Sequence, residues 1–309
     1  MSETWTLKCS DGEEYTFLTL NAPNDFSYNA RFQLLKGAYG HHGMPVKYLS
    51  DPIPGIAGEE LRDEQRPIRE IYMPIRIQGS DAADFETNKA ALRRSLRPDN
   101  TVELWITNSL GDTRVCYMKY LEGFDKAVDD DKRTTTWLNV PLRLAGFDPY
   151  FYDIPGNEIT HTVDYSAPMR PFYRTPWFGD PWVINKAGVD RTWTVINDGD
   201  EDAYPIWKVA GPGKAPRFEN LTTGKTFLLN YTLAAGETVT ADFRDYGGNP
   251  HTVESELGGV TKNLRPYMDA TLRTMWPLVP GPNDLAVELS AGQGGAAVEF
   301  SFLNRFEGV

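Results

Sequence analysis

An acidic turn in the second half of the chain is the first place where the residue types suggest chemistry. Asp198, Asp200 and Asp202 have the spacing of the first three ligands of a calcium loop. Such a loop needs a glycine at its sixth position and a glutamate at its twelfth, where this chain has Ala203 and Val209. We therefore interpret the segment as a solvated turn before a strand, with a bound cation as the less favoured alternative.

Two adjacent histidines, His41 and His42, form the second candidate and lie in a glycine-rich segment. A metal site or an acid–base pair needs a spacing that aims both rings at one point, and no third ligand lies near them in the sequence. The other two histidines, His161 and His251, are far away along the chain. We therefore predict a loop role for the pair, with no metal and no cofactor.

Sequence patterns of known catalytic sites are also missing. Residues 211–214 (GPGK) look like the end of a phosphate loop, but no glycine stands five residues before Gly213 and no Ser or Thr follows Lys214. Neither a nucleophile elbow nor a zinc spacing occurs, and the many carboxylates fall in no glycosidase motif. We predict that the protein is not an enzyme.

An aromatic and proline-rich insertion at residues 167–190 leaves two interpretations open. Trp177, Phe178 and Trp182 have rings that could stack on sugars, which makes a carbohydrate-binding module that contacts the host cell wall an alternative function. The other interpretation is a proline-stiffened loop that packs its rings on its own domain or on a neighbouring subunit.

The composition limits the classes of protein. A chain of 309 residues is long enough for two domains, which we predict. Its net charge of −12 predicts no sequence-specific binding of nucleic acid, because such binding needs clustered Lys and Arg. The chain has no run of eighteen apolar residues and no signal-peptide pattern at its start, which predicts cytoplasmic synthesis and no membrane insertion. Cys9 and Cys116 are predicted to be packing thiols in a reducing compartment.

The chain is predicted to be mainly β. Its first half, residues 1–148, is predicted to be an α+β domain with one helix on a β-sheet or barrel-like sandwich. The apolar residues of segment 71–77 alternate strictly, as in a strand, and Pro74 within it indicates an edge or a bulge. The helix is predicted at residues 81–96, because Ser80 or Asp81 can cap it and its apolar residues recur at helical spacing. Other strands are predicted at 4–7, 15–20, 101–107, 114–120 and 134–144. A long connection without periodicity is predicted at 21–66, and a loop of this length is usually functional, disordered until bound, or an arm that faces a partner.

The second half, residues 149–309, is predicted to be an all-β sandwich of two sheets. Short alternating segments follow one another with turn residues between them and no convincing helix. Because Pro205 has no N–H to donate, the strand that follows the acidic turn should begin near Tyr204 or lie at an edge. The predicted strands are 158–164, 191–196, 203–210, 217–221, 225–229, 238–243, 284–289 and 296–302.

Several segments, taken in their order and spacing, resemble the distal tail protein (Dit) family of bacteriophages with long non-contractile tails. The resemblance covers nearly the whole chain. It rests on residues 69–79 (REIYMPIRIQG), 92–98 (LRRSLRP), 111–114 (GDTR), 145–150 (AGFDPY), 197–212 (NDGDEDAYPIWKVAGP), 223–224 (TG), 235–237 (AGE) and 276–283 (WPLVPGPN).

The resemblance implies a structural protein of the virion, located at the phage tail tip and assembled in the host cytoplasm. It implies a homohexameric ring built by an N-terminal belt domain, and an outward C-terminal domain with a galectin-like sandwich. The implied partners are other copies of the chain, the tail tube protein, the tape measure protein and the tip or baseplate hub protein, and DNA would pass through the ring. The candidates for ring or partner contacts are Ile71, Met73, Pro74, Ile75, Asp129, Asp130 and Asp131. For the three aspartates a solvated hairpin tip is the favoured interpretation, and an acidic feature that faces the lumen or a partner is the alternative.

Overall fold

The chain divides into two units in the computed structural model, which describes residues 3–19, 31–53, 55, 57–125, 135–164, 188–244, 251–290 and 296–309. Unit 1 comprises residues 1–154 together with 305–309, and unit 2 comprises residues 155–304. The division therefore falls a few residues after the position 148 expected from the sequence. The last five residues also return to the first unit, which the sequence did not indicate.

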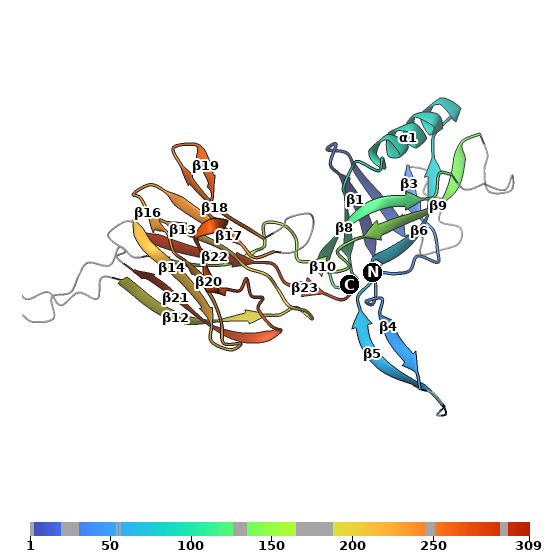
Figure 1. Ribbon diagram of the computed structural model, residues 1–309. Coiled ribbons are helices and arrows are strands. Elements are labelled where there is room, and N and C mark those ends of the chain that lie inside the picture. Colours follow the sequence, from blue (N-terminus) through green and yellow to red (C-terminus); the bar gives the residue numbers. More distant parts are fainter. Residues whose placement is uncertain are drawn as a thin grey trace, which may run out of the picture. The chain divides into compact units, whose positions relative to one another are not determined.

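Unit 1 is a mainly antiparallel sheet that curls into a nearly closed barrel (Figure 1). The strand order is β23-β10-β8-β7-β1-β2-β3-β6-β9, and a further pairing between β8 and β9 brings the sheet back onto itself. Among the described strands of this sheet, β2 and β3 are the one pair that runs parallel. The strands are β1 (Thr4–Cys9), β2 (Glu14–Thr19), β3 (Phe32–Leu34), β6 (Arg69–Gln78), β7 (Val102–Thr107), β8 (Thr113–Glu122), β9 (Trp137–Gly146), β10 (Phe151–Tyr152) and β23 (Arg305–Phe306).

The predicted edge position of the Pro74 strand is wrong, because β6 lies between β3 and β9. Pro74 is tolerated there for a local reason. Its carbonyl accepts a hydrogen bond from the backbone N–H of Leu35, so its nitrogen also faces that side of the strand. Strand β3 ends at Leu34, and the missing donor therefore falls just beyond the paired region.

The helix α1 (Ala82–Ser95) confirms the predicted helix and its cap. Asp81 has extended backbone dihedrals, and its side chain accepts a hydrogen bond from the N–H of Asp84 at 2.9 Å. The side chain of Asp84 in turn accepts from the N–H of Ser80 at 2.8 Å. Phe85 and Leu92 are buried against the barrel, as their spacing predicts.

Asp81→Ala is expected to lower the stability of unit 1 by about 1 kcal/mol, the usual cost of a lost N-cap side chain. Asp81→Asn keeps a cap acceptor and is expected to cost much less. Thermal unfolding of both variants checks this, and equal destabilisation by the two substitutions would contradict a capping role.

Both cysteines are packed inside unit 1, as predicted. Burial raises the pKa of the Cys116 thiol to about 12. Burial, together with the nearby carboxylates of Asp11 and Glu13, also raises the pKa of Cys9 to about 12. Both thiols are therefore protonated at neutral pH and poorly reactive.

Unit 2 contains two antiparallel sheets, which confirms the mainly β class (Figure 1). One sheet has the order β11-β22-β13-β17-β18-β19, and the other β12-β21-β14-β15-β20 with β16 beside β14. Their bounds are β11 (Ile159–Asp164), β12 (Gly188–Asn197), β13 (Ile206–Ala210), β14 (Gly213–Asn220), β15 (Lys225–Leu229), β16 (Thr232–Leu233), β17 (Thr238–Asp242), β18 (Thr252–Leu257), β19 (Val260–Asn263), β20 (Met268–Arg273), β21 (Gly281–Ser290) and β22 (Ala297–Phe302). A 3₁₀ turn, Arg265–Tyr267, precedes β20.

Aromatic side chains fill the core of unit 2. The ring of Trp207 stacks on Phe218, with 4.3 Å between the centroids, and meets Trp276 edge to face at 5.9 Å. Strand β13 begins directly after Pro205 and is an interior strand, with Trp207 and Val209 facing the core. These rings hold the unit together and present no surface to a ligand.

Candidate functional site

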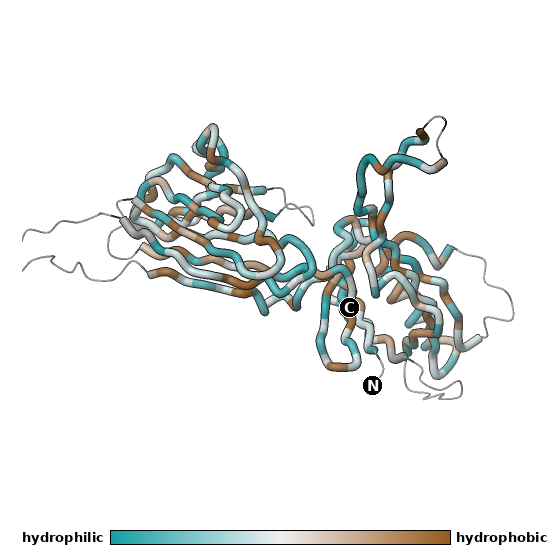
Figure 2. The backbone as a smooth tube through the Cα atoms, turned by 90° about the horizontal axis from the view of Figure 1, so that it is seen from below, coloured by the Kyte–Doolittle hydropathy of each residue, from teal (hydrophilic) through white to brown (hydrophobic). Residues whose placement is uncertain are grey.

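An arm formed by β4 (Lys47–Pro52) and β5 (Glu59–Gln65) extends away from the barrel of unit 1 in both views (Figures 1 and 2). The two strands pair only with each other among the described residues. Every residue of β5 is exposed, and in β4 only Leu49 is half-buried. An isolated two-stranded hairpin is marginally stable in water, so the arm is a candidate surface for a partner that would cover it.

The arm also exposes large apolar side chains. Tyr48 is 63% exposed and Leu61 is 59% exposed, although both residue types are usually buried in part. Polar pairs join the two strands of the arm, including an ion pair of 2.8 Å between Arg62 and Asp51. Exposed apolar residues within a charged surface are typical of a protein–protein contact.

Arg69 follows shortly after the arm and anchors the chain there. It is completely buried, and its guanidinium donates hydrogen bonds to four backbone carbonyls, those of Gly40, Gly43, Pro149 and Glu307. Its cation also lies 4.9 Å from the centre of the Phe151 ring. One side chain therefore ties together the 40–43 loop, the segment just before β10 and the residues that follow β23.

The 40–43 loop is packed too tightly for a larger residue at position 40. Gly40 has a φ of +100°, and a Cβ there would lie 2.2 Å from the carbonyl oxygen of Glu70. The loop is also bound to the end of the chain, since Val309 donates its N–H to the carbonyl of His41 at 3.1 Å. The two histidines that follow Gly40 therefore sit on a fixed backbone.

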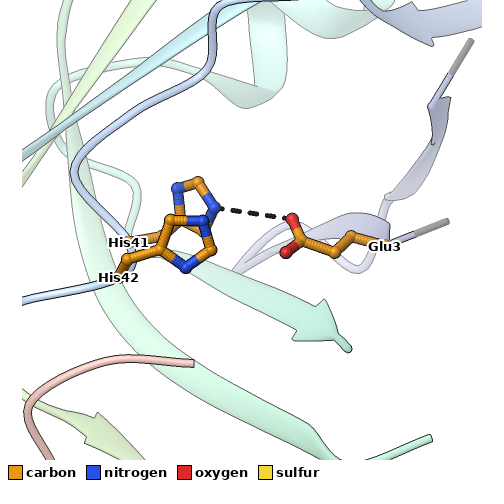
Figure 3. A group of neighbouring side chains, drawn as sticks. All are labelled: Glu3, His41 and His42. Carbon is orange, nitrogen blue, oxygen red and sulfur yellow. Dashed lines mark ion pairs between the residues drawn. The ribbon is translucent and has the colours of Figure 1, made fainter. Parts of the chain in front are cut away.

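His41 and His42 meet a carboxylate from the start of β1 (Figure 3). The Nε2 atom of His41 lies 3.4 Å from an Oε atom of Glu3, and the two imidazole centroids are 3.8 Å apart. One ligand atom from each of the three residues lies within 4.8 Å of the others. The sequence showed no third ligand near the histidines, because Glu3 comes close only through the fold.

Burial controls the charge of His41. Its side chain is 5% exposed. Desolvation of the imidazole by burial, together with the electrostatic effect of neighbouring His42, lowers the pKa of His41 to about 4. The imidazole is therefore neutral at pH 7, and its contact with Glu3 joins a neutral ring to a carboxylate.

The residues predicted as ring contacts differ in how exposed they are, and some of them lie outside the described part of the chain. The side chains of Ile71, Met73 and Ile75 are 0% exposed and belong to the core of unit 1, so they offer no side-chain surface to a neighbouring copy. Pro74 is half-buried on the other face of the strand. Six predicted residues lie outside the described part of the chain: Asp129, Asp130, Asp131, Trp177, Phe178 and Trp182.

The acidic turn at Asp198–Asp202 gathers no group of metal-ligating residues in the part of the chain that the structure describes. Asn197 organises this turn instead, since its buried amide donates to the carbonyls of Glu201 and Leu278 and its oxygen accepts from the N–H of Gly199. Across the described ranges, no helix combines the length and the apolar character needed to cross a membrane.

The chain has the fold of phage tail hub and baseplate proteins. The crystal structure of the SPP1 Dit (gp 19.1) protein, described as a paradigm of the hub adsorption apparatus in phages that infect Gram-positive bacteria, aligns with a TM-score of 0.63 at 15% identity over 98% of this chain and 99% of that chain. A chain of the phage P2 baseplate in its activated conformation with Ca aligns with a TM-score of 0.54 at 12% identity, covering 100% of both chains.

The same P2 baseplate with Sr gives a TM-score of 0.53 at 12% identity, again over 100% of both chains. No family model matches the sequence, and no curated protein matches it at a significant level. At these low identities the likeness is one of fold, and it extends over both units.

Proposed function

We propose that the protein is the distal tail hub of a phage with a long non-contractile tail. In this role it forms a homohexameric ring through unit 1 and joins the tail tube to the tail tip or baseplate. Its partners are copies of itself, the tail tube protein, the tape measure protein and the tip hub protein. It acts as a structural part of the virion, without enzymatic activity.

The observation that carries this proposal is the fold match, which spans 98% of this chain and includes both units in sequence order. A likeness confined to one unit would fit many unrelated β proteins, because a fold alone does not determine a function. A match that covers both units, in tail hub and baseplate proteins, is far more specific.

The exposed arm supports a ring. In a closed ring each copy offers one surface to the copy before it and a different surface to the copy after it. An arm that leaves its own barrel and carries Tyr48 and Leu61 on its surface is suited to lie on the next copy, which would bury those side chains. The arm replaces the strand at residues 71–77 as the element that we propose for the ring contact.

The charge balance supports passage of DNA through the ring. With a net charge of −12 per chain, a lumen that shares the negative balance repels phosphates, so DNA moves through without binding.

The galectin-like character of unit 2 remains a prediction, as does contact of Trp177, Phe178 and Trp182 with host glycans.

Electron microscopy of the purified full chain tests the proposal. We expect six-fold rings in class averages, and a mass six times that of the 34.8 kDa chain by light scattering. A chain that stays monomeric at every concentration tried, and that is also missing from the tail end when antibodies label the virion, would refute the hub assignment.

A further inference from the structure

The cluster of Glu3, His41 and His42 has the donor atoms of a transition-metal site. Two imidazoles and one carboxylate are ligands that Zn²⁺ and its neighbours in the first transition row accept. Calcium and magnesium prefer oxygen ligands only, so this set does not suit them. All three ligand atoms lie within 4.8 Å of one another, although Glu3 and the histidines come from separate elements of unit 1.

The spacing of His41 and Glu3 also fits two ligands of one metal ion. The 3.4 Å from Nε2 to the carboxylate oxygen exceeds the 2.7–3.2 Å of a normal N–H···O hydrogen bond. Two ligands at about 2.0–2.1 Å from one zinc ion, at a tetrahedral angle, lie about 3.3 Å apart. The pair is therefore already spaced as two corners of a zinc tetrahedron.

The groups around the cluster hold its ligands in place. The indole N–H of Trp5 donates to the same Oε2 atom of Glu3 at 3.2 Å, and the edge of the Trp5 ring packs against His41, with 4.6 Å between centroids. The backbone of His41 is held by the N–H of Val309, and the adjacent carbonyl of Gly40 is held by Arg69. Ligands fixed in this way by outer groups are typical of metal sites, because the site pays little entropy when the ion binds.

Exposure differs among the three ligands in a way that allows an ion to enter. His41 is buried, whereas His42 is exposed and the side chain of Glu3 is 31% exposed. We propose that Glu3, His41 and His42 bind one divalent first-row transition metal ion, Zn²⁺ being the best match, with water in the fourth position. The ion cross-links the start of β1 to the 40–43 loop and so stabilises unit 1.

Zinc titration of the full chain, prepared without a polyhistidine tag and stripped with a chelator, tests this proposal. Isothermal titration calorimetry is expected to give one Zn²⁺ per chain. His42→Ala and Glu3→Gln are each expected to weaken binding at least about 10-fold, since each removes one of three ligands. The midpoint of thermal unfolding should rise with Zn²⁺ in the unaltered chain and much less in both variants.

His161→Ala is the matched control, because His161 is also exposed but belongs to unit 2. It should bind Zn²⁺ as the unaltered chain does. The proposal is overturned if the unaltered chain takes up no Zn²⁺, if both ligand variants bind it unchanged, or if His161→Ala lowers the affinity as much as His42→Ala. If Glu3→Gln fails to fold, the exposed His42 variant decides the question alone. The test is independent of ring formation.

Discussion

A chain in which a short Gly–Ser linker replaces residues 47–65 is expected to fold normally and to remain monomeric. The arm pairs only with itself among the described residues and contributes no side chain to the core of unit 1. Its loss should therefore leave the thermal unfolding of the chain nearly unchanged. The ring contact that we assign to the arm should be abolished, and light scattering would show the change from ring to monomer.

A smaller change in the arm should act in the same direction. Replacing Tyr48 and Leu61 together by serine removes the apolar contact and leaves the hairpin backbone in place. The matched control is Val260→Ser, since Val260 is 69% exposed at the tip of the β18–β19 hairpin of unit 2. Rings that persist after the arm is deleted would show that another surface of unit 1 makes the contact.

Arg69→Met is expected to have the largest effect on stability, lowering the free energy of unfolding of unit 1 by about 3 kcal/mol or more. The substitution removes the donor of four carbonyl oxygens, of which that of Pro149 lies in a buried contact and the other three in partly buried ones. A buried acceptor left without its donor costs about 1–3 kcal/mol. Arg69→Lys should recover little, because one ammonium group cannot reproduce the fork of the guanidinium.

Urea unfolding that resolves the two units separately provides the measurement. Only the transition of unit 1 should move, so the transition of unit 2 serves as an internal reference. Arg76→Met is the matched control on the same strand, because Arg76 is only half-buried and donates to a single described group, the side-chain oxygen of Asn139. An equal loss in both variants would mean that the carbonyl contacts of Arg69 are unimportant.

The strands that the sequence predicted are those with one buried face. In β6 the residues alternate between buried and half-exposed along the whole strand, so the hydrophobic pattern reports the burial directly. All eight strands predicted for the second half are present, for the same reason. The helix was predictable because its cap at Asp81 and its apolar spacing agree.

The arm could not be predicted in this way. Both faces of β4 and β5 are exposed, so the segment has no alternation, and the long connection predicted over residues 21–66 hid a hairpin. A strand pattern arises only where one face is buried by the same chain. The element that we propose for assembly is thus the one with the weakest strand signal.

The polar sites were missed for a different reason. Arg69 contacts Glu307, and His41 contacts Glu3. The partners in each pair lie far apart in the sequence, so a local sequence pattern cannot predict their contact. Arg69 also stands in a strand where a charged residue suggests an exposed position, yet it is 0% exposed. The fold of unit 1 brings these groups together.

The return of residues 305–309 to unit 1 sets an order of events during translation. Unit 2 is inserted into unit 1, and β23 reaches its partner β10 only after residues 155–304 have been made. At 5–20 residues per second, a ribosome needs roughly 8 to 30 s to make the intervening segment, residues 155–304. Unit 2 can therefore fold on the nascent chain while unit 1 still waits for its final strand.

This order also delays completion of the arm, which is the surface that we propose for assembly. Glu307 accepts a hydrogen bond from Arg69 and forms an ion pair with Arg66, which directly follows the arm. The base of the arm is thus completed by residues that are made only after the whole of unit 2. A chain cut before residue 305 would lack this support for the arm that we propose for the ring contact.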